Sequence, residues 1–209
     1  MSASVEVKQK AVIGPSLGQE AIDSGIVSFI LAIVILMIYM IAVYGVVPGL
    51  VANVALIINL FFTIGILASF QAVLTLSGIA GLVLSLAIAV DANVLIYERA
   101  KEELRAGKNA RAALADGYKN AFSAIFDSNF TSIITGVILF YFGTGPIRGF
   151  ATTLIIGILC SFFTAVFLTR VVYEHFMNKG KWLNLSFVTG LSKNLMLHNK
   201  FNFMKARRV

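Results

Sequence analysis

The sequence predicts an all-α membrane protein, a polytopic helical bundle of five transmembrane helices. The first observation is composition, because 58% of the 209 residues are hydrophobic and only 13% are charged. The mean hydropathy is +0.88, whereas soluble domains carry about 25% charged and about 45–50% apolar residues. The second observation is that the apolar residues fall in five long stretches. These features exclude a soluble globular enzyme, a disordered tail and a soluble nucleic-acid-binding domain.

The five apolar stretches are each long enough to cross a bilayer, which takes about 20 helical residues. We place them at residues 25–44, 50–70, 75–97, 121–142 and 149–172. A polar turn around Gln71 separates the second stretch from the third. All three prolines lie before the first stretch or between stretches, as expected because proline disrupts a helix interior. They are Pro15, Pro48 and Pro146.

The segments outside the stretches complete the domain organisation, with three spans in 25–97 and two in 121–172. We interpret residues 1–24 as the remnant of an external domain leading into the first span. Within it, residues 5–9 alternate like a strand and residues 14–18 are typical of a turn that opens a helix. Residues 98–120 predict a cytoplasmic amphipathic connector of one or two short surface helices, broken at Gly107. Residues 173–209 predict a basic cytoplasmic tail.

Basic residues mark the cytoplasmic side of the membrane. Of the 17 Lys and Arg residues, six lie in 98–120 and eight lie from Arg170 onward. Because cytoplasmic segments of membrane proteins are enriched in Lys and Arg, we expect both segments in the cytoplasm. An odd number of spans then puts the N-terminus on the outer side of the membrane. This topology alone explains the net charge of +7, so we expect membrane lipid but no nucleic acid as a partner. The alternative is that the basic tail contacts anionic lipid or ribosomal RNA.

The sequence offers little chemistry of the kind found in soluble enzymes. Cys160 is the single cysteine, and only His175 and His198 carry an imidazole, so no metal-site spacing occurs. There is no Walker A loop, no dinucleotide-binding fingerprint after a strand and no Gly-x-Ser-x-Gly motif. We therefore expect no cofactor, no metal and no enzymatic activity.

Two carboxylates interrupt the apolar stretches, Asp91 in the third and Asp127 in the fourth. An aspartate at the centre of a membrane helix costs about 2.5–3.5 kcal/mol, so we expect each to face the bundle interior, a water-filled cavity or a partner. Removal from water favours the neutral form of a carboxylic acid, which suits Asp91 to binding and releasing protons. The alternative is a structural hydrogen bond to Ser85 or to Asn93 of a neighbour. We expect Asp127 nearer the cytoplasmic face, where a structural role is favoured.

Small residues recur along three of the predicted spans, where they let helix backbones approach closely. The third span has Gly78, Gly81, Ser85, Ala89 and Ala92, the fourth has Ser128, Thr131, Ser132, Thr135 and Gly136, and the fifth has Gly149, Thr153, Gly157, Ser161 and Ala165. We therefore expect these spans to pack against one another. The hydroxyl groups of the fourth span could alternatively line a water path.

Three separated motifs resemble those of the SecD family of bacterial protein-export membrane proteins. They are GLVLS at 81–85 followed by AVDANVLIYER at 89–99, GTGPIRGFA at 143–151, and VIGPSLG at 12–18. The motifs occur in the order found in the family, and the similarity covers about residues 10–176. The resemblance implies the resistance-nodulation-division superfamily of proton-driven transporters, and it equates the five stretches with spans two to six of SecD.

The resemblance implies a function in protein export across the bacterial inner membrane. SecD pairs with SecF and acts with the SecYEG translocon, and YajC and YidC are further partners. The pair uses the proton-motive force to draw secreted precursor proteins out of the channel. The first span and most of the periplasmic region of the family are not in this sequence. We therefore expect a fragment whose tail leads toward a SecF half, fused or separate.

The resemblance also implies roles for particular residues. The aspartate of the family's Asp-Ala-Asn motif falls on Asp91, which is the implied proton-transfer residue, and Asn93 is its motif neighbour. Asp127 and Asn129 match a further segment of the family. We add two supporting polar residues of the fourth span, Ser128 and Thr131.

Three alternatives remain. A lipid or drug exporter of the same superfamily would carry external substrate domains, which this sequence does not contain. A scaffold that holds translocon subunits together without transporting would tolerate replacement of Asp91 by Asn. Intramembrane aspartyl proteases also use two aspartates on separate spans, but residues 88–90 (IAV) differ from the Gly-x-Gly that precedes such an aspartate.

Overall fold

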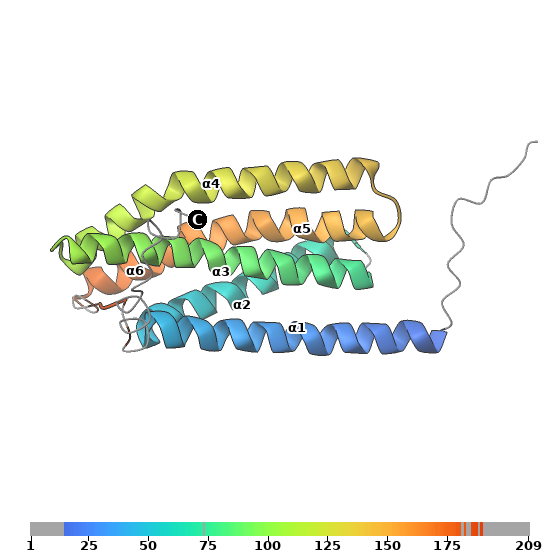
Figure 1. Ribbon diagram of the computed structural model, residues 1–209, viewed down its shortest axis with the longest axis horizontal. Coiled ribbons are helices and arrows are strands. Elements are labelled where there is room, and N and C mark those ends of the chain that lie inside the picture. The colour runs from blue at the N-terminus through green and yellow to red at the C-terminus, as the bar shows by residue number, and fades with distance from the viewer. Residues whose placement is uncertain (1–14, 73, 181, 183–184, 188, 190–209) are drawn as a thin grey trace, which may run out of the picture.

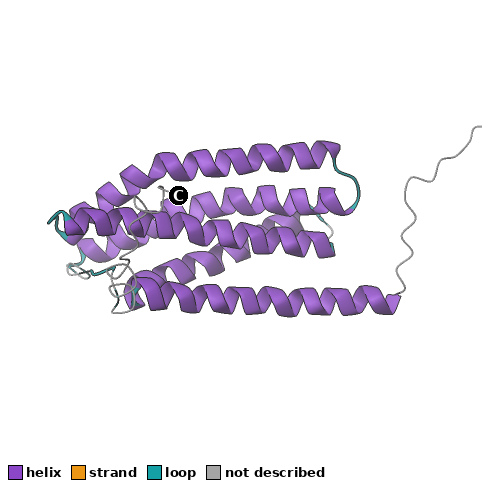
Figure 2. Ribbon diagram, viewed as in Figure 1, coloured by secondary structure: helices purple, strands orange, loops and turns teal. Residues whose placement is uncertain are grey.

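The protein is helical throughout the residues that the structure, a computed structural model, describes, which are 15–72, 74–180, 182, 185–187 and 189. The helices are α1 (Pro15–Tyr44), α2 (Val46–Ser69), α3 (Leu76–Arg105), α4 (Ala110–Phe142), α5 (Pro146–Phe162), the π-helical segment η1 (Phe163–Leu168) and α6 (Thr169–Asn178). No strand occurs among the described residues (Figure 2). The all-α prediction is therefore confirmed, while the strand-like pattern at 5–9 lies outside the described residues.

Five helices are long and apolar enough to cross a membrane, as the sequence predicted. They are α1 from Gly18 onward, α2, α3, α4 and the continuous run of α5, η1 and α6. The helices extend beyond the apolar stretches at several ends. α1, for example, begins at Pro15, where a missing amide hydrogen costs no helical hydrogen bond.

The central helix of the bundle is α3. It contacts α1, α2, α4 and α5, and Figure 1 shows it between α1 and α4, with α2 and α5 behind it. Helices α1 and α4 are peripheral: only 6% and 17% of their most apolar segments are buried, against 56% for α3. One broad face of the bundle, formed by α1, α3 and α4, is therefore left uncovered by other described helices.

The hairpin between α1 and α2 depends on two glycines. Gly45 is the single residue between the helices and has φ +92°, a left-handed conformation that glycine adopts readily. At Gly49 an added Cβ would lie 2.6 Å from the Cα of Ile41, so the two backbones touch there. Pro48 in the first turn of α2 needs no helical partner for its nitrogen. The helix therefore starts at Val46 instead of near residue 50, where the sequence placed the span.

Residues 98–120 form the ends of two long helices, which corrects the expectation of separate short surface helices. Only residues 106–109 separate α3 from α4, and the predicted break is at Gly107, with φ +89°. Both helices continue because they pack on each other: a Cβ added to Gly117 would lie 2.9 Å from the amide nitrogen of Ala100. Ala100, Ala113, Leu114 and Tyr118 of this segment are thus buried.

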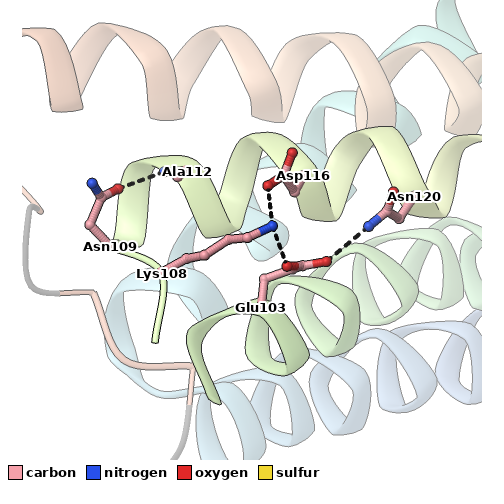
Figure 3. A network of polar contacts seen from close by, with 6 residues as sticks. All are labelled: Glu103, Lys108, Asn109, Ala112, Asp116 and Asn120. Atoms are coloured by element: carbon pink, nitrogen blue, oxygen red, sulfur yellow. Dashed lines mark hydrogen bonds and ion pairs between the residues drawn. The ribbon is translucent and has the colours of Figure 1, made fainter. Parts of the chain in front are cut away.

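A polar network closes the turn between α3 and α4 (Figure 3). The Lys108 ammonium lies 2.6 Å from a Glu103 carboxylate oxygen and 2.7 Å from Asp116, and Asn120 donates a hydrogen bond to Glu103 at 3.0 Å. Asn109 caps α4 by accepting a hydrogen bond from an amide of its first turn at 2.8 Å. Hydrogen bonds to Asp116 and then to Glu103 raise the pKa of Lys108 above its ordinary value. The turn is therefore fixed by charge as well as by backbone geometry.

The described part of the predicted tail, residues 173–209, packs back on the bundle. α6 ends at Asn178, and the Phe187 ring is fully buried with its centre 5.3 Å from that of Tyr97 on α3. The Thr189 hydroxyl donates a hydrogen bond to the Ala42 carbonyl at the end of α1, at 2.7 Å. This segment therefore ties together the ends of α1 and α3, and residues 190–209 lie outside the described residues.

Candidate functional site

Contacts between small residues hold α3 against α5. A Cβ added to Gly81 would overlap the Thr153 hydroxyl oxygen, and one added to Gly157 would overlap the Ser85 side chain. Both contacts join residues 72 positions apart, so the two helices run parallel. In the predicted fourth span Gly136 packs against Ile155, but Ser128, Thr131 and Thr135 are exposed. The predicted packing is therefore confirmed for the stripes of the third and fifth spans. It fixes the rotation of α3 and therefore the direction in which its remaining faces point.

A second face of α3 is exposed and carries Asp91. Its exposed residues Ala80, Leu84, Ala87 and Asp91 follow one another at intervals of four, three and four, the spacing of one helical face. Figure 1 shows α3 flanked by α1 and α4, so this face forms the middle of the uncovered side of the bundle. Asp91 therefore points away from the interior of this chain.

Asp91 makes no hydrogen bond or ion pair with any residue that the structure describes. The hydroxyl of Ser85 instead donates to the Leu82 carbonyl at 2.8 Å, and the Asn93 amide donates to the Ala89 carbonyl at 3.3 Å. The structural alternative considered for Asp91, a hydrogen bond to Ser85, is therefore not formed within this chain.

The helix register places Asp127 at the depth of Asp91, which corrects the expectation that Asp127 lies nearer the cytoplasmic face. Ala100 and Gly117 are in contact where α3 and α4 cross. Asp91 precedes Ala100 by nine residues and Asp127 follows Gly117 by ten. At a rise of about 1.5 Å per residue, Asp91 lies about 14 Å and Asp127 about 15 Å from that contact, measured along the axes of their helices and in the same direction.

Asp127 lies on an exposed part of α4 together with Ser128 and Thr131. The hydroxyls on this helix donate to carbonyls one turn earlier: Thr131 to Asp127 at 2.8 Å, Ser132 to Ser128 at 2.9 Å and Thr135 to Thr131 at 3.1 Å. Such bonds let hydroxyls sit in an apolar environment. Each hydroxyl oxygen keeps a lone pair for water or a partner.

Asn93 and Asn129 are buried, in contrast to the two aspartates. Each is 3% exposed. The Asn129 amide donates to the Ile125 carbonyl at 2.9 Å, as Asn93 does to Ala89, and in both residues the side-chain oxygen has no partner among the described residues. A buried oxygen without a donor costs roughly 1–3 kcal/mol, so both positions are suited to bind an internal water molecule.

Sequence reasoning did not single out two further buried amides, Asn53 and Asn59 on α2. They are 3% and 0% exposed, and the Thr63 hydroxyl donates to the Asn59 carbonyl at 2.8 Å. Their side chains each leave one polar atom without a partner in the described structure. The available signal was the occurrence of two amides in an otherwise apolar stretch.

Sequence reasoning also missed the π-helical segment η1. It contacts α3 and α2, and the register of α3 and α5 places it beside residues 91–96. The Thr164 hydroxyl donates to the Cys160 carbonyl at 3.0 Å, which satisfies a helix carbonyl at the start of the π register. π-helical turns are rare and often occur near functional sites. Hydrophobic periodicity carries no signal for such a segment.

The fold and the site define a class: a multi-pass helical membrane protein with a carboxylate deep in a span on an uncovered face. The grouped His, Cys, Asp and Glu residues that a metal requires do not occur in the described ranges. Carboxylates such as those of Asp91 and Asp127 are groups that can bind and release protons, and each has a buried amide, Asn93 or Asn129, two residues further along its helix.

Comparison with known proteins gives the family. The family model "Protein export membrane protein SecD/SecF, C-terminal" matches residues 1–179, and the chain belongs to this family. It is 52% identical over 174 residues to the protein translocase subunit SecD of Desulfurispirillum indicum, which covers 83% of this chain and 34% of that protein. It is 46% identical over 181 residues to SecD of Rhodothermus marinus, and the match covers 87% of this chain and 29% of that protein.

A solved structure agrees with the fold. The crystal structure of SecDF from Thermus thermophilus, described as a translocon-associated membrane protein, matches with a TM-score of 0.84 and 39% identity, over 94% of this chain and 26% of that one. The chain spans about a third of the length of the SecD relatives that it matches. The predicted resemblance to SecD is therefore confirmed over the membrane-spanning helices.

Proposed function

We propose that this chain is the membrane-spanning part of a Sec protein-export subunit that uses the proton-motive force through Asp91 to assist translocation of secreted precursor proteins through SecYEG. The proposal assigns a transport role, not catalysis, in keeping with the translocase names of the relatives. It rests on membership of the SecD/SecF family and on the placement of Asp91.

The observation that carries the proposal is an unpaired carboxylate inside a span on an exposed face of α3. Facing lipid, it would cost about 2.5–3.5 kcal/mol. Contacts with α5 through Gly81 and Gly157 prevent α3 from turning this face inward. A second helical bundle or water must therefore cover it, and we propose the SecF half as the partner that does so.

The mechanism follows from a change of charge at this face. A proton arriving from the periplasm neutralises Asp91, and its release toward the cytoplasm restores the charge. The charged form favours an arrangement of the two halves that gives Asp91 water or a cationic partner, while the neutral form tolerates closer apolar packing. One charge crossing 100 mV supplies about 2.3 kcal/mol, enough to shift a two-state equilibrium about fifty-fold.

The supporting residues have distinct roles in this proposal. Asn93 and Asn129 hold water through their unpaired side-chain oxygens. Asp127, with Ser128 and Thr131 beside it, forms a second polar surface at the depth of Asp91, through which water reaches the interface of the two halves. We assign Asp91 the proton and the other residues the hydration of its surroundings.

The assembly and topology complete the proposal. The chain lies in the bacterial inner membrane with its N-terminus in the periplasm and its C-terminus in the cytoplasm, because the basic residues of 98–120 and of the tail then face inward. We also propose that residues 1–24 lead from a periplasmic domain into the first span, and that the tail continues toward a SecF half. SecF and SecYEG are the direct partners, with YajC and YidC as further members.

Replacement of Asp91 by Asn in the full-length protein tests this function. Export of a secreted precursor into inner-membrane vesicles is followed with and without an imposed proton gradient, with Asp23→Asn, at an exposed position near the start of α1, as the matched control. We expect Asp91→Asn to remove the stimulation by the gradient while co-purification with SecF stays normal, and Asp91→Glu to restore part of it. Gradient-stimulated export that persists in Asp91→Asn would make Asp91 a residue of a scaffold.

A further inference from the structure

A small cavity of about 130 Å³ lies where α4 begins and α6 ends. Its rim carries the charged and polar side chains of Arg111, Arg170, Glu174 and Asn178. Its floor is apolar and buried, and includes Leu114 and Met177. None of these residues belongs to the polar surface around Asp91 and Asp127, which is why the proposed function leaves them without a role.

The cavity is positively charged. Arg170 donates to Glu174 at 2.8 Å, and Arg111 donates to Asn178 across the gap between α4 and α6. Each of these hydrogen bonds uses one nitrogen of its guanidinium group. Because a guanidinium carries five N–H donors, both arginines have further N–H groups that can bind a ligand. Two cations and one carboxylate leave the rim with one net positive charge, and donors from two helices converge on the same small space.

The depth of the cavity matches the headgroup layer of a bilayer. The Tyr118 and Thr169 hydroxyls, 2.6 Å apart, join the two helices where their apolar stretches end. The cavity residues on α4, 111–118, precede its apolar stretch, and those on α6, 170–178, follow the last apolar residues of η1. The rim, before the stretch at 121–142 and at the end of the one at 149–172, therefore lies at the edge of the hydrocarbon, near the level of lipid phosphates.

We propose that this cavity binds the phosphate of an anionic phospholipid headgroup, held by Arg111 and Arg170. Guanidinium groups suit phosphate because their planar N–H pairs match two phosphate oxygens. A free phosphate offers the same oxygens, but the cavity opens at the bilayer surface, where a lipid supplies phosphate with its tails already in the membrane. Occupation bridges α4 and α6 and so stabilises the end of the bundle at which Tyr118 meets Thr169. Glu174 competes with the phosphate for Arg170.

Native mass spectrometry of the full chain, released from phosphatidylcholine bilayers with a rising fraction of phosphatidylglycerol, tests the proposal. We expect the double variant Arg111→Gln/Arg170→Gln to lose about tenfold in apparent affinity for phosphatidylglycerol. The matched control Arg99→Gln/Arg105→Gln, which removes the same two charges from exposed positions of α3, should stay within about twofold. An equal loss in the control would overturn the site, because general surface charge would then explain binding.

A second variant keeps the test decisive if the double variant folds poorly, as judged by its helical circular dichroism. Glu174→Gln removes the competing carboxylate and should raise the affinity for phosphatidylglycerol several-fold, whereas a purely structural ion pair predicts no gain. An unchanged or reduced affinity overturns the proposal.

Competition distinguishes the two sources of phosphate. Millimolar inorganic phosphate or glycerophosphoglycerol should fail to displace the lipid if tails and headgroup are both required. Displacement by either soluble compound would assign the cavity to a free anion and would contradict the lipid proposal.

Discussion

At the scale of single residues, buried tyrosine hydroxyls join the helices at one end of the bundle. Tyr97 on α3 donates to the Pro48 carbonyl of α2 at 3.0 Å and accepts from Tyr173 of α6 at 3.1 Å. Tyr97 and Tyr173 are both 0% exposed. Buried hydroxyls need hydrogen-bond partners. Tyr97, which bonds to both α2 and α6, therefore helps to position three helices.

Replacement of Tyr97 by Phe should therefore destabilise the protein. It leaves the Tyr173 hydroxyl and the Pro48 carbonyl without this partner, and we expect a loss of about 1 kcal/mol in the free energy of unfolding. Unfolding in mixed micelles measures it. Tyr141→Phe is the control, because Tyr141 is 79% exposed. Equal losses in the two variants would show that the hydrogen bonds of Tyr97 contribute nothing beyond surface effects.

The ion pairs of Lys108 give a pH-dependent prediction. The carboxylates of Asp116 and Glu103 raise its pKa above the ordinary value of 10.5, so its contribution to stability is complete below pH 10.5 and is lost as the pH rises through the higher folded-state pKa. The melting temperature of Lys108→Gln should lie below that of the wild type at pH 8, and the difference should shrink only above about pH 10.5. Lys179→Gln, a change outside this network, should show no such convergence.

At the scale of elements, the parallel packing of α3 and α5 sets the direction of Asp91. Replacement of Gly81 by Ala forces a methyl group onto the Thr153 hydroxyl and to 2.8 Å from the Phe150 carbonyl. We expect a loss of about 1–3 kcal/mol. Gly65→Ala is the matched control, because nothing lies within 4 Å of an added Cβ there, and it should gain about 0.5–1 kcal/mol. Similar effects of the two changes would contradict the proposed contact.

Sequence reasoning predicted the spans and the small-residue contacts of α3 with α5 well, because hydropathy and small residues are local signals. It did less well on the fourth span, where Thr131 and Thr135 of the predicted stripe are exposed. It failed between α3 and α4, where charged residues were read as a surface connector. There the burial of Ala100 against Gly117 keeps both helices continuous, and such a tertiary contact outweighs local polarity. The π register of η1 was also out of reach, since it depends on how the helix packs beside α2 and α3.

At the scale of the whole molecule, the uncovered side of the bundle could not be located from the sequence. An intramembrane aspartate had to face an interior, a cavity or a partner. The structure adds that Asp91 and Asp127 are both exposed and at similar depth, while Asn93 and Asn129 are buried. The rotation and register of the packed helices expose the two aspartates and bury the two asparagines. Residue type alone predicts neither the rotation nor the register.

The most direct test of the central claim is to observe the protonation of Asp91 itself. Infrared difference spectra of the full-length protein in membranes, recorded as the pH is lowered, report the carboxylic acid band that appears when a carboxylate takes up a proton. We predict a band that is absent in Asp91→Asn and present in Asp127→Asn. A band that persists in Asp91→Asn, or no band in the wild type, would contradict the account.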